Sequence, residues 1–146
     1  MADEITESIL GAAIEVHKAL GPGLLESVYE ECLALEFKLR GLDFQRRLSL
    51  PIKYKGCTVN AAYRIDFLVR QSVVLEIKAV EKLESIHEAQ ILTYLKLLKF
   101  ERGLLINFNV PLLKNGIKRL VLNYQQTSAL SAPPVSYTHL TLPTKA

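Results

Sequence analysis

The stretch that decides the fold is Val73-Val74-Leu75-Glu76-Ile77-Lys78-Ala79, an apolar run interrupted by two charges. Its β-branched residues predict a buried strand. Side chains two residues apart share one face of a strand, so Glu76 and Lys78 are expected on the same side. Two charges on a buried strand are costly unless something compensates them, and a metal ion would do so better than their mutual attraction. A salt bridge on a half-exposed strand is the alternative.

The preceding strand, predicted over residues 59–69, carries Asp66, a residue type disfavoured inside strands. Alternation would divide its side chains between two faces, with Tyr63, Ile65, Phe67 and Val69 on one face and Arg64, Asp66 and Leu68 on the other. In a tight hairpin with the strand at 73–79, Asp66 would reach the face of Glu76. Two close carboxylates repel, and one would stay protonated unless a divalent cation held both. Magnesium prefers carboxylate oxygens of this kind.

Two helical segments supply further candidates. Glu26 lies in Gly23-Leu24-Leu25-Glu26-Ser27-Val28-Tyr29, at the start of a helix predicted over residues 24–40, and could be a third carboxylate. An early glutamate that merely favours the helix dipole is the alternative. Gln90 and Tyr94 are four residues apart in a helix predicted from about residue 85 to 100, so they share one of its faces. An amide and a phenol there could donate to phosphate or orient water.

The remaining periodicity completes the α-α-β-β-β-α-β-β order of an α/β fold, a mixed β-sheet flanked by helices. Further elements are predicted at residues 4–20 (helix) and at 44–52, 103–107 and 117–122 (strands). Gly56 supplies a positive φ in the turn after the first strand. We expect one domain over residues 1–124. Residues 125–146, which include Tyr137 and His139, are expected to be a disordered or non-native tail without site residues.

The 146-residue chain has 49% hydrophobic and 23% charged residues, which is typical of a globular protein. No apolar run approaches the roughly 18 residues needed to span a membrane, and the acidic N-terminus is unlike a secretory signal. Cys32 and Cys57 lack metal-ligand spacing and predict reduced thiols. We therefore expect a cytoplasmic protein with no membrane partner.

The net charge of +3 combines an acidic N-terminal segment with a basic region after it. Five bases in or beside the first two predicted strands could follow a phosphate backbone, namely Arg46, Arg47, Lys53, Lys55 and Arg64. A solvated surface paired with the acidic N-terminal helix is the alternative.

Taken together, these segments resemble the GxxExxY protein family, which is placed in the PD-(D/E)XK nuclease superfamily. The resemblance rests on residues 16–30, Arg64-Ile65-Asp66-Phe67-Leu68-Val69, Leu75-Glu76-Ile77-Lys78-Ala79 and Gln90-Ile91-Leu92-Thr93-Tyr94, in order. It covers about residues 5–123 and implies a restriction-endonuclease-like core with a divalent-metal site. One departure is Ile65, which stands where the superfamily has its naming proline.

The resemblance also implies roles for single residues. Glu26, Asp66 and Glu76, with the Ile77 carbonyl, would hold Mg²⁺ or Mn²⁺. Lys78 would position water or steady developing charge, and Gln90 and Tyr94 match the helix motif of the exonuclease-like branch. His17 resembles a residue that could approach the metal, with a structural role as the alternative.

We therefore expect a divalent-metal-dependent nuclease that hydrolyses phosphodiester bonds, with DNA as the expected substrate. Two alternatives remain: a non-catalytic nucleic-acid-binding or assembly module, and a structural protein with fortuitous charges. A homodimer is also left open, as are the choice of DNA or RNA and of endo- or exonucleolytic cleavage.

Overall fold

The computed structural model describes residues 3–123, without the side chains of residues 60–62. The described elements, in chain order, are α1 (Glu4–Leu20), α2 (Glu26–Leu39), β1 (Phe44–Tyr54), β2 (Cys57–Val69), β3 (Val73–Lys78), α3 (Ser85–Leu98), β4 (Arg102–Asn107), the 3₁₀ helix η1 (Leu113–Gly116) and β5 (Ile117–Val121). The expected order α-α-β-β-β-α-β-β is confirmed, and the expected tail at 125–146 lies outside the described residues.

The five strands form one mixed sheet in the order β1-β2-β3-β4-β5. β3 and β4 pair in parallel, which requires the crossover that α3 provides, whereas the other neighbours are antiparallel. β3 is therefore the middle strand, and its run from Val73 to Ile77 is buried throughout. This central position explains the continuous apolar run that surrounds Glu76 in the sequence.

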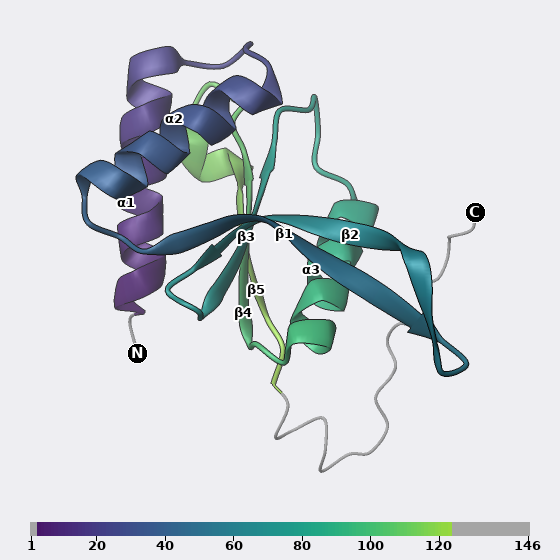
Figure 1. The fold of residues 1–146 in the computed structure, drawn as a ribbon. Helices are drawn as coiled ribbons and strands as arrows, with labels where there is room; N and C mark the ends of the chain where they lie inside the picture. The colour runs from purple at the N-terminus through teal and green to yellow at the C-terminus, as the bar shows by residue number, and fades with distance from the viewer. Residues whose placement is uncertain (1–2, 124–146) are drawn as a thin grey trace.

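Helices cover both faces of the sheet (Figure 1). α1 and α2 pack on one face over a first core that includes Leu33, Phe37 and Leu75. α3 packs on the other face over a second core that includes Ile91, Leu95 and Val74. Gly103 permits the close approach of α3, because a Cβ there would lie 2.6 Å from the Ile91 Cγ2 atom. The molecule is thus a three-layer α/β/α fold.

The long β1–β2 hairpin departs from the alternation that the sequence predicts. Phe67 and Val69 belong to the first core, but Ile65 belongs to the second core, so the predicted shared face of Ile65 and Phe67 is wrong. The β1–β2 ladder pairs Arg46 with Phe67 and Leu48 with Ile65, and skips the intervening Arg47 and Asp66. Arg47 has a left-handed backbone with φ 54°. This irregularity lets the strands change face at Asp66.

The turns and caps follow ordinary local chemistry. Asp3 caps α1 by accepting a hydrogen bond from the Ile5 amide. Lys55 and Gly56 both have positive φ at the β1–β2 turn, as a two-residue type I′ hairpin turn requires.

Among residues 3–123, no helix has both the length and the apolar character needed to cross a membrane.

Candidate active site

The site forms where β2 and β3 part. Their ladder runs from Val69 opposite Val73 to Phe67 opposite Leu75, and Asp66 and Glu76 would form the next pair. Asp66 is thus missing from the ladders on both sides of its strand. Backbone groups that leave a ladder in a buried place need other partners.

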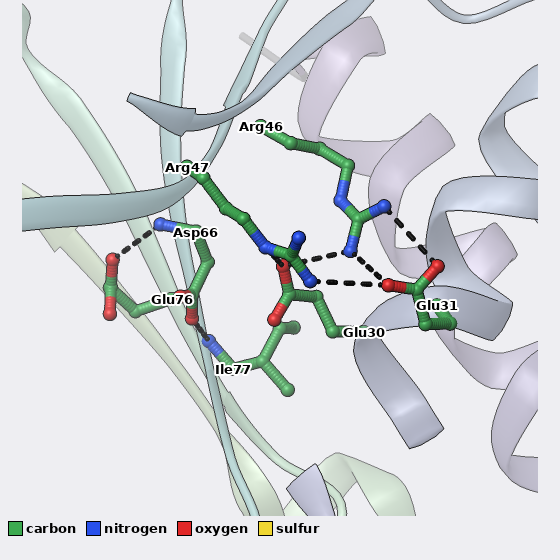
Figure 2. A network of polar contacts seen from close by, with 7 residues as sticks. All are labelled: Glu30, Glu31, Arg46, Arg47, Asp66, Glu76 and Ile77. Carbon is green, nitrogen blue, oxygen red and sulfur yellow. Dashed lines mark hydrogen bonds and ion pairs between the residues drawn. The ribbon is translucent and has the colours of Figure 1, made fainter. Parts of the chain in front are cut away.

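The two carboxylates supply those partners. The Asp66 amide donates to a Glu76 carboxylate oxygen at 3.0 Å, and the Ile77 amide donates to an Asp66 carboxylate oxygen at 2.8 Å (Figure 2). Each acid therefore holds the backbone of the other strand. This reciprocal pair fixes both side chains at the point where the strands diverge.

Burial makes these acids electrostatically costly. Glu76 is only 4% exposed, and burial followed by the charge of Asp66 raises its pKa to about 8. Burial likewise raises the pKa of Asp66, with a further contribution from the charge of Glu30. Two neighbouring carboxylates that are largely withdrawn from water favour a shared proton or a bound cation.

Glu26 is the first residue of α2 and is exposed. Burial of its carboxyl, and next the charge of Asp66, raise the pKa of Glu26, while Lys78 lowers it. The preceding loop is held by the buried Tyr29, whose hydroxyl donates to the Gly21 carbonyl at 2.6 Å and accepts from the Leu24 amide at 3.1 Å. Tyr29 thus sets where Glu26 begins its helix.

The expected meeting of three acids at one point is incomplete. Within residues 3–123, no group of three or more His, Cys, Asp or Glu side chains is arranged to hold a metal ion. The structure brings Asp66 and Glu76 together, and the charge of Asp66 raises the pKa of Glu26, but within the described residues Glu26 does not complete a trio. The donor set still fits a hard divalent cation, because the carboxylates of the half-buried Asp66 and the buried Glu76 are oxygen ligands whose repulsion a cation relieves.

Lys78, Gln90 and Tyr94 lie around this pair. Lys78 is half-buried, and its charge acts on Asp66 and Glu76. Tyr94 is 1% exposed, and burial, followed by the charges of Glu76 and Asp66, raises its pKa. An interaction with the Gln90 side chain opposes this shift and lowers the pKa of Tyr94. The phenol therefore keeps its proton and remains a hydrogen-bond donor beside the acids.

His87, one helical turn before Gln90, faces the same region. Its Nδ1 accepts from the Glu84 amide at 2.9 Å as part of a capping box that begins α3. Burial, and next the charge of Lys78, lower the pKa of His87. His87 thus combines a structural role at the start of α3 with proximity to Lys78.

Sequence reasoning missed Glu30, a second acid on α2. Glu30 is only 8% exposed, accepts a hydrogen bond from Arg46 at 3.0 Å and forms an ion pair with Arg47 at 3.3 Å (Figure 2). The neighbouring Glu31 also binds both arginines, at 2.8 and 3.1 Å. The available signal was the spacing of four residues between Glu26 and Glu30, which places both on one helix face. Its arginine partners are distant in sequence and needed the fold.

The other predicted residues divide into two groups. Arg46 and Arg47 are held by α2, so their assignment to a phosphate backbone stays a prediction that requires them to exchange or share partners. Lys53, Lys55 and Arg64 are exposed on the β1–β2 hairpin. His17 is buried, with its Nε2 2.8 Å from the Val110 carbonyl oxygen, as the structural alternative for it predicts.

Comparison with known proteins agrees with this architecture. Residues 3–120 match the family model described as the PD-(D/E)XK nuclease superfamily. No curated protein and no solved structure matches the chain. The narrower resemblance to the GxxExxY family stays a prediction, as do the roles of the single site residues. The match spans most of the chain, and the paired acids lie where two strands of the sheet diverge. The chain therefore belongs to the PD-(D/E)XK nuclease superfamily.

Proposed function

We propose that the protein is a divalent-metal-dependent nuclease that hydrolyses phosphodiester bonds, with DNA as its substrate. The observation that carries the proposal is the pair Asp66 and Glu76. Glu76 is buried and Asp66 is half-buried, and each carboxylate accepts a hydrogen bond from a backbone amide of the other's strand. A fold that needed only stability would favour apolar residues in this place.

Asp66, Glu76 and the Ile77 carbonyl would hold Mg²⁺ or Mn²⁺, with Glu26 joining them from α2. Such a cation, when bound, supplies Lewis-acid activation of water and neutralises charge at the phosphate. Lys78 would steady the negative charge that develops on the phosphate oxygens. Tyr94, which Gln90 contacts and whose pKa is raised, would donate a hydrogen bond to a phosphate oxygen.

Cleavage assays test this proposal directly. Wild-type protein is incubated with single- and double-stranded DNA and RNA in Mg²⁺, in Mn²⁺ and in a chelator. We expect cleavage only with the metals, and a loss of about 100-fold or more in Glu76→Ala and in Lys78→Ala. Activity that survives in both variants would show a contaminating nuclease and would refute the assignment of these residues.

One observation favours a second candidate, a nucleic-acid-binding or assembly module without catalysis. The described residues hold no complete trio of metal-binding side chains. For this candidate, the same assays would give binding that weakens with salt but no cleavage in either metal. Lys78→Ala separates the two proposals. In a nuclease it should abolish most of the cleavage, whereas in a binding module it should lower the affinity by at most the contribution of one phosphate contact.

A further inference from the structure

The β1–β2 hairpin has an unusual charge. Between Phe44 and Ile65 the chain carries five bases and no Asp or Glu. The bases are Arg46, Arg47, Lys53, Lys55 and Arg64. A segment that carries bases and no acids can attract a polyanion such as nucleic acid.

The five bases are not equivalent. Glu30 and Glu31 of α2 pair with Arg46 and Arg47 next to Asp66. Lys53, Lys55 and Arg64 are exposed and make no ion pair with any described residue. The uncompensated charges of the hairpin are therefore those of Lys53 and Lys55 near its turn and that of Arg64, two residues before Asp66.

Two aromatic rings are exposed among these cations. Tyr54 is 63% exposed at the hairpin turn, with the Lys55 ammonium 5.3 Å from its ring centre. Tyr63 is 42% exposed, and its ring packs edge-on against Tyr94 with centroids 5.6 Å apart. The charges of Glu76 and Asp66 in turn contribute to the raised pKa of Tyr94. The Tyr63 ring is thus linked through Tyr94 to the neighbourhood of the acid pair.

We propose that this hairpin binds a single-stranded segment of nucleic acid and leads it to the acid pair. The inference rests on the proposed function and adds its substrate class. Lys53, Lys55 and Arg64 would hold phosphates, and Tyr63 and Tyr54 would stack on unpaired bases. Bases in a duplex stack on one another and hide the faces that tyrosine rings need, whereas a single strand exposes them. From Asp66 to the turn at Cys57 the strand spans about 30 Å, which is long enough for several nucleotides.

The test measures binding by fluorescence anisotropy with the full chain in EDTA, so that cleavage cannot intervene. The probes are labelled single-stranded DNA and RNA of about 20 nucleotides and the DNA duplex of the same sequence. We expect at least one single strand to bind about tenfold or more tightly than the duplex. Tyr63→Ala should weaken single-strand binding by about tenfold, and Tyr63→Phe should keep the preference because it retains the ring.

Two further variants protect the test against misfolding of Tyr63→Ala. Tyr54→Ala alters an exposed ring at the turn and should weaken single-strand binding in the same direction. Lys53→Ala/Lys55→Ala should reduce the slope of log affinity against log salt by about 1.4. The matched control Lys18→Ala/Lys38→Ala removes two exposed lysines from the helices α1 and α2 and should leave that slope unchanged.

Equal binding of duplex and single strands would overturn the inference, as would equal effects of the hairpin and helix double variants. Cleavage of a duplex without any single-strand preference would refute this inference and leave the proposed nuclease intact. Single-strand binding without metal-dependent cleavage would refute the nuclease and leave this inference intact.

Discussion

Glu76 illustrates, at the scale of one residue, how stability and chemistry conflict. Its carboxylate is buried against Asp66, and its pKa is raised to about 8. A glutamate in the unfolded chain has the ordinary pKa of 4.5. The folded chain therefore retains a proton that the unfolded chain releases. The stabilisation that this proton provides is fully present below about pH 4.5 and is lost as the pH rises through about 8.

Glu76→Gln should remove this pH dependence. Glutamine keeps an oxygen that can accept from the Asp66 amide but has no charge to bury. In chelator, the variant should be more stable than wild type at about pH 9 by on the order of 3 kcal/mol, with little difference at about pH 4. Thermal and urea unfolding across this range measure the effect.

Glu15→Gln is the control for this measurement, because it removes one negative charge from an exposed position on α1. Equal shifts of stability in Glu76→Gln and Glu15→Gln at every pH would contradict the raised pKa of Glu76. A destabilisation by Glu76→Gln that is largest at high pH would contradict it as well. Either result would mean that Glu76 is not a buried, proton-retaining acid.

At the scale of elements, the contact between α2 and β1 depends on Glu30. The Glu30 side chain is 11% exposed and binds two guanidinium groups, whereas the Glu31 side chain is 58% exposed. Nε of Arg46 is buried without a hydrogen-bond partner among the described residues, so this arginine depends on its terminal nitrogens. The guanidinium of Arg46 also lies 5.7 Å from the Phe67 ring centre.

Glu30→Ala should therefore destabilise the chain by about 2 kcal/mol, because it leaves partly buried arginine charge without its innermost partner. Glu31→Ala is the matched comparison, and its effect should be clearly smaller because water can replace an exposed carboxylate. Urea unfolding at neutral pH measures both variants. Equal losses would show that burial does not distinguish the two acids.

The elements were largely predictable from the sequence, because their signals are local. The helix at 4–20 has a regular apolar period and a capping Asp3, and its bounds agree with α1. The change of face at Asp66 was not predictable, since it depends on the left-handed backbone of Arg47 in the neighbouring strand. The central strand β3 ends at Lys78, one residue before Ala79, where the sequence predicted its end.

At the scale of the whole molecule, the site is an assembly of distant segments. Asp66, Glu76 and Lys78 could be predicted from charges in strands that should be apolar, and Tyr94 from its helical spacing. The role of Glu30 could not be predicted, and neither could the distinction between paired and unpaired bases on the hairpin. Both depend on ion pairs between α2 and β1, which follow from how the layers pack. The sequence also could not show that Glu26 stops short of a complete trio.

We propose that Asp66 and Glu76 form a site for a divalent cation, which Glu26 would join from α2 when the cation is bound. Titration of the full chain with Mn²⁺, followed by calorimetry and by the resonance signal of free Mn²⁺, tests it without substrate. We predict saturable binding in the wild type, loss of that binding in Glu76→Gln, and about tenfold weaker binding in Glu26→Gln. Absence of saturable binding in the wild type, or equal binding in Glu76→Gln, would contradict the claim.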